Sequence, residues 1–272
     1  MSTSTKEEGI RVCCNTGHPT LTGGCGEYVP QGKVVQLDDS GLNGYVVSPK
    51  EGQISSKSAI VAVYDIFGLD IVSTRRFLDL IAEQTKKRVL MPDFFRGQPW
   101  PLSKFPPTDP AIFKNWVEDV GKWVDFSKDL KSAHQFLVST GVDAQSPLGI
   151  IGFCWGGKQV FMACSGDTHA QKLGFKFGAG VVLHGSFIGP EDAEGITVPI
   201  LFMPAGNDPP HEPIKEVLDK KSFGSQCIYH RFETETHGFA AARGDWTNDC
   251  TRKSILKAAK FTSDFFGKHL PQ

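Results

Sequence analysis

The 272-residue sequence has no long hydrophobic run, no excess of one charge and no Asn-X-Ser/Thr glycosylation acceptor. Its longest apolar stretches, such as residues 59–64 and 179–183, are far too short to cross a bilayer. Lys and Arg total 29 and Asp and Glu total 30, so no basic field points to nucleic acid. We therefore expect a protein that binds neither membranes nor nucleic acids.

The amino terminus also lacks a basic start followed by an apolar segment, so no secretory signal is expected. The seven cysteines are odd in number and mostly scattered, which favours free thiols in the cytoplasm over a disulfide framework. The N-terminal pair Cys13-Cys14, even with His18 nearby, fits no paired zinc-ligand spacing, so no metal site is expected. Residues 1–32 are predicted to form an arm packed on the body.

Short β-rich runs alternate with longer helical patterns through residues 33–272. This alternation favours a single α/β domain, a mostly parallel sheet with helices on both faces. About eight strands are predicted, at 33–37, 42–47, 59–64, 88–91, 148–152, 179–183, 200–203 and 227–232. The first two are expected to form an antiparallel hairpin at the sheet edge.

Helices are expected between these strands. Ser73 is predicted to cap the first helix, and the segment 94–115, rich in proline and aromatics, is predicted to be an irregular excursion. A single helix is predicted through residues 116–137. Further helices are predicted over 159–163, 214–220 and 249–267.

The strongest local feature is the segment Gly152–Gly157, Gly-Phe-Cys-Trp-Gly-Gly, which follows a strand and precedes a helix. A Gly-X-nucleophile-X-Gly turn of this kind is so tight that its central residue adopts strained backbone angles. The N-terminus of the following helix favours negative charge there, and hence the thiolate. The alternative is a buried cysteine at an ordinary corner. Because the strand, the helix and the glycines all match, Cys154 is predicted to be a nucleophile.

This segment resembles the dienelactone hydrolase family when taken with Tyr64–Leu69 (Tyr-Asp-Ile-Phe-Gly-Leu) and Thr236–Phe239 (Thr-His-Gly-Phe). The likeness runs from about Lys33 to the C-terminus. It implies an α/β-hydrolase fold, a Cys-His-Asp triad that cleaves esters or lactones, and no metal or organic cofactor. Carboxymethylenebutenolide is the substrate that gives the family its name.

Two further residues are predicted to complete the triad, since this fold has the chain order nucleophile, acid, histidine. His237 lies just beyond the last strand and would pass the proton of Cys154 to the leaving group. His184 breaks the chain order, so it is expected to line the pocket or pack beneath it. Asp208 follows the strand 200–203 and would orient the histidine, although an Asp before two prolines is also an ordinary helix N-cap.

Position and resemblance suggest three more roles around the nucleophile. Asp65 holds a position that resembles that of a family glutamate which contacts the cysteine and gates its ionisation. Being one methylene shorter, Asp65 either reaches Cys154 or is a plain carboxylate at a strand end. The backbone N–H groups of Trp155 and Ile66 are expected to form the oxyanion hole.

The resemblance also implies arginines that hold a substrate carboxylate. Arg96 and Arg243 lie near suitable loops, with solvated surface arginines as the alternative. Trp100, Phe105 and Trp155 are candidates for the pocket wall, although aromatics in such a fold more often belong to the core.

The sequence thus predicts a cysteine-dependent hydrolase of small esters or lactones that works through a thioester acyl-enzyme. The alternative is a catalytically weak scaffold that binds a small molecule or a protein partner, favoured by the short Asp65 and the offset arginines. A redox role for Cys154 is a third option, because an activated thiolate also oxidises. Either a monomer or a homodimer fits the sequence.

Overall fold

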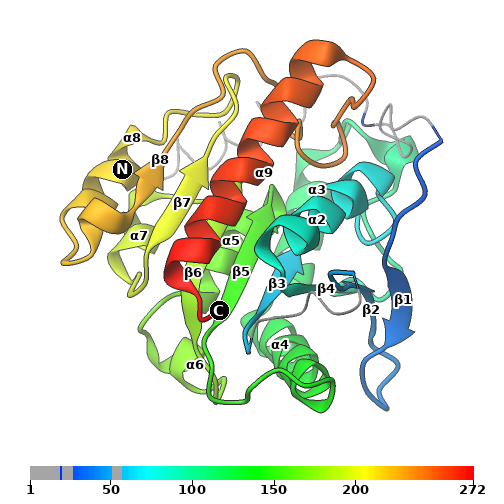
Figure 1. The fold of residues 1–272 in the computed structure, drawn as a ribbon. Coiled ribbons are helices and arrows are strands. Elements are labelled where there is room, and N and C mark those ends of the chain that lie inside the picture. Colours follow the sequence, from blue (N-terminus) through cyan, green and yellow to red (C-terminus); the bar gives the residue numbers. More distant parts are fainter. Residues whose placement is uncertain (1–18, 20–26, 51–56) are drawn as a thin grey trace.

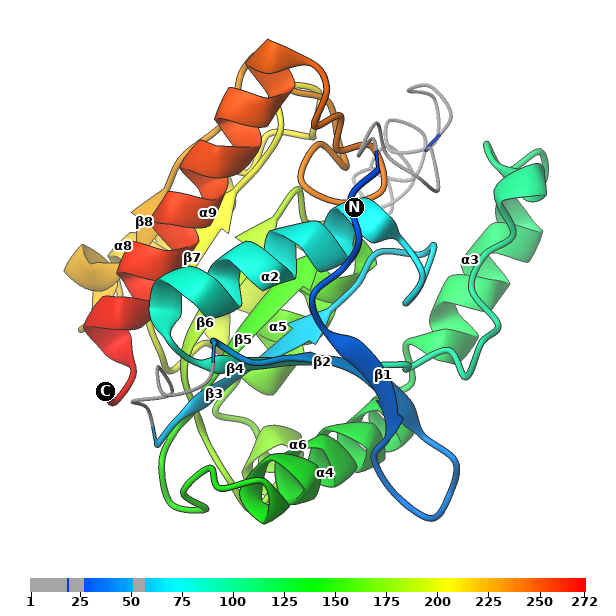
Figure 2. The same cartoon turned by 45° about the vertical axis from the view of Figure 1, so that its right-hand side comes forward.

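The computed structural model describes Pro19, residues 27–50 and residues 57–272. These residues form an eight-stranded sheet of order β1-β2-β4-β3-β5-β6-β7-β8, with α2 and α9 on one face and α4 and α5 on the other (Figures 1 and 2). The strands are β1 Lys33–Gln36, β2 Asn43–Val47, β3 Ala59–Val63, β4 Arg88–Pro92, β5 Leu148–Phe153, β6 Phe177–Leu183, β7 Ile200–Met203 and β8 Ile228–Tyr229. The helices are α2 Val72–Thr85, α3 Pro110–Val120, α4 Trp123–Ser139, α5 Trp155–Ala163, α6 Thr168–Gln171, α7 Pro190–Glu194, α8 Glu212–Asp219 and α9 Asp249–His269, with 3₁₀ turns η1 Leu102–Lys104 and η2 Gly224–Gln226.

The pairing confirms the predicted α/β fold. Strands β1 and β2 form an antiparallel hairpin, and β2 is also antiparallel to β4. The remaining pairs are all parallel. Every residue of β3 and β5 is buried, because helices cover both faces of a central parallel strand. The carboxyl ends of these strands meet at one edge, where open α/β sheets place their ligands.

The helix predicted over 116–137 is two helices, and this prediction is wrong in two ways. Asp109 caps α3, with its carboxylate accepting from Ala111 N and Ile112 N, so the helix begins inside the segment predicted to be irregular. The chain then breaks at Gly121, and the extended Lys122 (ψ 119°) precedes α4. In Figure 2, α3 stands away from the sheet at one side of the molecule.

Three end assignments also differ from the sequence prediction. Ser73 lies inside α2 and does not cap it, because the N-cap is Ile71 and the Ser73 hydroxyl accepts from Trp246 Nε1 at 3.0 Å. The strand predicted over 227–232 is reduced to the two residues of β8. Beyond them, Phe232 makes only an isolated bridge to Ala205. Helix α5 begins at Trp155, earlier than the predicted range.

The described end of the predicted N-terminal arm, residues 27–32, lies against α2. The Tyr28 hydroxyl donates to Asp79 Oδ2 at 2.7 Å, and Gln31 N donates to the same oxygen at 2.9 Å. Cys13, Cys14 and His18 lie outside the described residues.

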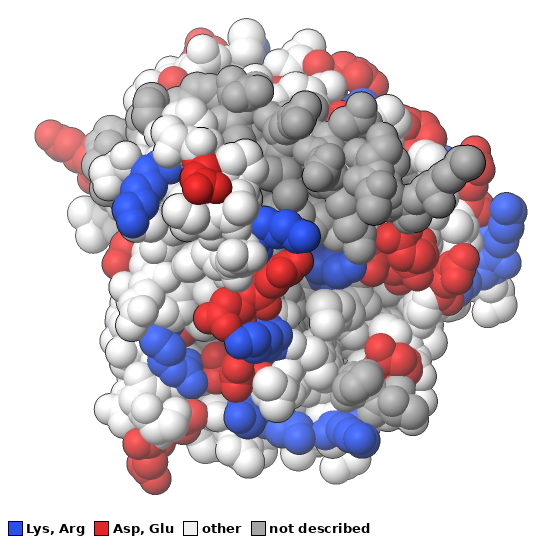
Figure 3. Space-filling view, turned by 180° about the vertical axis from the view of Figure 1, so that it is seen from behind, with Lys and Arg blue, Asp and Glu red and all other residues white. Residues whose placement is uncertain are grey.

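The surface carries both signs of charge. Seen from behind, lysines and arginines are interspersed with aspartates and glutamates, and neither sign covers this face (Figure 3). Within the described part of the chain, no helix is long and apolar enough to cross a membrane.

Candidate active site

The turn after β5 holds Cys154 in a strained conformation. Its φ of 53° and ψ of −113° place a non-glycine residue outside the comfortable regions of backbone space, as the sequence predicts for a nucleophile turn. The glycines make this possible. A Cβ on Gly156 would lie 2.3 Å from Val63 O, and one on Gly152 would lie 2.3 Å from Gly156 O. Helix α5 therefore sits directly against β3 and β5, with Cys154 at its N-terminal end.

Asp208 and His237 form a buried hydrogen-bonded pair. Asp208 Oδ1 lies 2.6 Å from His237 Nδ1, and both side chains are nearly inaccessible to solvent. The second oxygen, Asp208 Oδ2, accepts from Ala205 N at 2.7 Å, and His237 N donates to Asn207 Oδ1 at 2.6 Å. Because α8 begins at Glu212 with His211 as its N-cap, Asp208 is not the cap of that helix.

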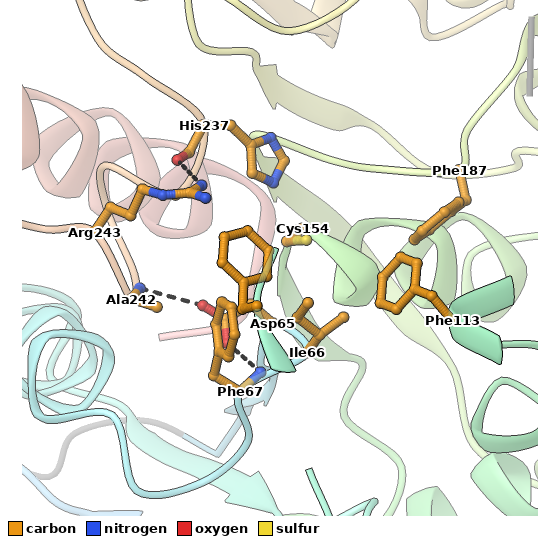
Figure 4. A pocket seen from close by; sticks show the side chains of 11 residues that line it. Asp65, Ile66, Phe67, Phe113, Cys154, Phe187, His237, Ala242 and Arg243 are labelled. Carbon is orange, nitrogen blue, oxygen red and sulfur yellow. Dashed lines mark hydrogen bonds between the residues drawn. The ribbon is translucent and has the colours of Figure 1, made fainter. Parts of the chain in front are cut away.

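His237 lies beside Cys154, with one ring nitrogen turned toward the sulfur (Figure 4). Burial alone would lower the pKa of His237, but the charges of Asp208 and Cys154 and the hydrogen bond to Asp208 raise it to about 10. Burial would in turn raise the pKa of Asp208, and the His237 charge outweighs it and lowers that pKa. The structure thus brings together the three residues that the sequence predicts as a triad.

Asp65 lies in the same pocket and is held by backbone donors. Its Oδ1 accepts from Phe67 N at 2.9 Å and its Oδ2 from Ala242 N at 3.2 Å (Figure 4). Burial, followed by the charge of Cys154, raises the pKa of Asp65 to about 7. Asp65 is therefore close enough to Cys154 for their charges to interact.

Ser186 is a residue that the sequence analysis missed. Its Oγ lies 3.5 Å from Cys154 Sγ, and its backbone N donates to Cys154 O at 2.9 Å. The only signal for it in the sequence is a small hydroxyl residue shortly after the strand predicted over 179–183, which pairs with β5 in the structure.

His184 packs beneath the triad and does not line the pocket. It is fully buried, and its ring centroid lies 4.9 Å from that of His237 in an edge-to-face arrangement. Burial lowers the pKa of His184 to about 3, so this imidazole is neutral. The sequence prediction of a substrate contact is not supported, whereas that of packing beneath the pocket agrees with this position.

The pocket above Cys154 is narrow and largely apolar. Four phenylalanines form part of its wall, and residues around Cys154 and His237 form the rest (Figure 4). The lining residues are Asp65, Ile66, Phe67, Phe105, Phe113, Cys154, Phe187, His237, Gly238, Ala242 and Arg243. Of the predicted wall residues, Phe105 lines this pocket. Phe113 and Phe187 were not singled out in the sequence.

The two predicted arginines lie in different places. Arg243 lines the pocket, and its guanidinium donates to His237 O at 2.8 Å. Arg96 does not reach the pocket, because its guanidinium forms an ion pair with Asp129 of α4 at 2.8 Å. Trp100 is also outside the wall. It is nearly buried and packs edge-to-face on Phe113, with ring centroids 4.9 Å apart.

Among the described residues, no group of three or more His, Cys, Asp or Glu side chains is arranged to hold a metal ion. The arrangement can perform nucleophilic chemistry from side chains alone. A thiol at a helix N-terminus is adjacent to a histidine that is oriented by a carboxylate.

Residues 42–270 match the model of the dienelactone hydrolase family. A Mus musculus protein named carboxymethylenebutenolidase homolog is 28% identical over 274 residues, covering 94% of this chain and 96% of its own. The solved dienelactone hydrolase from Anabaena variabilis is similar with a TM-score of 0.60 at 14% identity, covering 89% of this chain and 100% of that one. An esterase from Thermogutta terrifontis with butyrate bound gives a TM-score of 0.57 at 16% identity, covering 88% and 94%. Since the family model spans most of the sequence and the fold agrees, the chain belongs to the dienelactone hydrolase family of α/β-hydrolases.

Proposed function

We propose that this hydrolase cleaves small esters or lactones with Cys154 as its nucleophile, through a thioester acyl-enzyme. The observation that carries the proposal is the strained turn that places Cys154 beside the hydrogen-bonded pair His237 and Asp208. The names of the relatives, carboxymethylenebutenolidase homolog and esterase, are consistent with this class of substrate.

The first half of the reaction forms the thioester. The Cys154 thiolate attacks the carbonyl carbon, and the backbone N–H groups of Trp155 and Ile66 stabilise the oxyanion. The pKa of His237, raised to about 10 by Asp208 and Cys154 against the effect of burial, keeps this imidazole protonated at neutral pH. When the tetrahedral intermediate collapses, the C–O bond to the alcohol breaks and His237 donates its proton to the departing oxygen.

The second half releases the acid. His237, now neutral, takes a proton from water as the water oxygen attacks the thioester carbonyl. The C–S bond breaks, which returns the Cys154 thiolate and the protonated His237. Arg243 lines the pocket beside His237, which suits it to contact a polar group of the substrate.

The test is the site of acylation. After mixing with p-nitrophenyl butyrate and quenching in acid, intact mass is expected to show one butyryl adduct, and peptide mapping is expected to place it on Cys154. The exposed Cys250 is the internal control for nonspecific acylation. An adduct on another residue would mean that the thioester mechanism is wrong.

Ser186→Ala is expected to lower kcat about 3- to 10-fold, because the hydroxyl contacts Cys154 Sγ at 3.5 Å. Loss of this donor disfavours the thiolate, so the midpoint of the pH profile for iodoacetamide alkylation is expected to move upward. Ser139→Ala, at an exposed position, is the matched control. An unchanged midpoint together with unchanged kcat would exclude a role for Ser186.

Asp65→Asn is expected to speed alkylation of Cys154 by roughly 3- to 10-fold above pH 8 and to leave it nearly unchanged below pH 6. The reason is that burial and the Cys154 charge raise the pKa of Asp65 to about 7. Asp65 is therefore neutral at low pH, and at high pH its negative charge opposes the thiolate. The measurement is the iodoacetamide rate from pH 5 to 9, with the exposed Asp39→Asn as control. A rate ratio that does not change with pH would contradict this assignment.

The same shift has a consequence for stability. An acid with a raised pKa in the folded state favours folding at low pH, and this contribution is lost as the pH rises from about 4 to about 7. Between about pH 4 and pH 7, wild type is therefore expected to lose stability relative to Asp65→Asn. The measurement is the melting temperature of both proteins at each pH.

A further inference from the structure

A larger groove adjoins the narrow pocket above Cys154. The pocket has a volume of about 20 Å³ and the groove one of about 310 Å³. About 20 Å³ is room for roughly one water molecule, whereas sites for small molecules begin at about 300 Å³. Phe187 lines both cavities, so its side chain lies between them. The narrow pocket alone has space for little beyond the reacting atoms.

One face of α5 forms the floor of this groove. Trp155, Gln159 and Met162 line it, and residues spaced by three and four positions share a helix face. Helix α3 supplies the opposite wall, including Val117. The walls are thus mainly apolar.

The two lysines that line the groove have carboxylate partners. Lys158 Nζ lies 2.5 Å from Asp192 Oδ1, and Lys114 Nζ lies 3.7 Å from Glu118 Oε1. Glu118 lines the groove as well, so neighbouring carboxylates balance the charges of both lysines, and the groove suits a neutral group better than an anion.

Gln159 lines this groove with a polar side chain. The residue is only 2% exposed, and its buried Oε1 has no hydrogen-bond partner within the described part of the chain. A buried acceptor left unpaired is unfavourable, and buried polar groups in native structures are nearly always hydrogen-bonded. A hydroxyl or amide N–H on a bound molecule would supply the missing donor once the side-chain amide turns to present Oε1, which is closed to solvent in this structure, to the groove.

The placement of His237 indicates which part of an ester would enter the groove. In Figure 4, His237 lies on one side of Cys154, and Phe113 and Phe187 lie on the other. Because His237 protonates the leaving alcohol, the alcohol occupies the His237 side and the acyl group extends toward Phe187. Gln159 follows Cys154 along α5 by roughly 7.5 Å at 1.5 Å per residue, within reach of a medium-length acyl chain.

We propose that the groove between α3 and α5 binds the acyl arm of the substrate. The arm is neutral and mainly apolar, passes Phe187, and carries a hydroxyl or amide N–H that donates to Gln159 Oε1. This assignment rests on the proposed hydrolase function, since it uses the roles of Cys154 and His237.

The experiment compares kcat/KM for three p-nitrophenyl esters: acetate, hexanoate and 6-hydroxyhexanoate. Wild type is expected to prefer the 6-hydroxyhexanoate over the hexanoate by about 3- to 10-fold, and Gln159→Leu is expected to lose that preference. Gln226→Leu, exposed and near the opposite edge of the sheet, is the matched control and is expected to keep it. Met162→Trp, which fills the groove, is expected to lower kcat/KM for both longer esters about tenfold relative to the acetate.

The outcomes separate the two proposals. If wild type cleaves the acetate ester through Cys154 but prefers 6-hydroxyhexanoate over hexanoate no more than Gln159→Leu does, the groove assignment is overturned and the proposed function stands. Equal loss on all three esters in Met162→Trp would overturn it as well, even where Gln159→Leu does not fold. If wild type cleaves none of the esters or cleaves them without Cys154, the proposed function and the groove assignment both fail.

Discussion

Cys154→Ala is expected to lower kcat for ester hydrolysis by about 10⁴-fold or more, because the variant lacks the atom that forms the thioester in the proposed mechanism. The residual rate would come from the oxyanion donors and from substrate binding. Cys154→Ser is expected to remain far below wild type as well, since the proposed pair of thiolate and imidazolium would be replaced by a hydroxyl that must be deprotonated during attack. The measurement is steady-state hydrolysis over a panel of small esters and lactones that includes carboxymethylenebutenolide.

Cys250→Ala is the matched control, because this cysteine is exposed on α9 and away from the pocket. It is expected to keep wild-type kcat and wild-type KM. Cys154→Ala with wild-type hydrolysis would remove the thiol from the mechanism. A folded wild type that neither cleaves the panel nor is alkylated at Cys154 near neutral pH would favour the binding-scaffold alternative.

Asp208→Asn is expected to lower kcat by about 10⁴-fold with a smaller effect on KM. The carboxylate accepts from His237 Nδ1 at 2.6 Å, whereas an amide NH₂ in its place would favour the wrong tautomer of the ring. Burial lowers the pKa of His237, and the charges of Asp208 and Cys154 together raise it to about 10. The variant removes the Asp208 charge and leaves the other two effects in place. The alkaline limb of the kcat/KM profile is therefore expected to move to lower pH.

The matched control is Asp264→Asn, whose carboxylate pairs with Lys260 on the exposed side of α9, away from the pocket and the groove. Thermal melting separates a catalytic loss from a folding loss, since Asp208 Oδ2 also accepts from Ala205 N. If Asp208→Asn lost activity only in proportion to its loss of folded protein, the role of the Asp208 carboxylate would be purely structural.

Local chemistry explains which parts of the structure were predictable. The turn around Cys154 is defined by neighbouring residues, so its glycines and its strained angles follow from the sequence. Chain order and strand position predict Asp208 and His237 as partners of Cys154, and in the structure these two side chains lie 2.6 Å apart. The antiparallel edge follows from the short turn that joins the first two predicted strands, and the buried central strand follows from a run that is apolar on both faces.

Packing between distant segments explains what was missed. The guanidinium of Arg96 forms an ion pair with Asp129, and the residues near Arg96 in the sequence do not indicate that partner. Apolar positions continue across Gly121, so periodicity could not separate α3 from α4. Ser186 contacts Cys154 only because β6 pairs with β5, which is a property of the assembled sheet.

The close contact of Gly156 with Val63 has a consequence for how the geometry of the reaction and the range of substrates can change in evolution. Any side chain at residue 156 would push α5 away from β3, and would move Trp155 N–H relative to Ile66, which follows β3 in the chain. The spacing of the two proposed oxyanion donors is thereby fixed by the sheet. The proposed acyl groove instead depends on α3, which stands apart from the sheet (Figure 2). Substitutions along α3 can therefore alter the range of substrates while the reaction geometry is inherited unchanged.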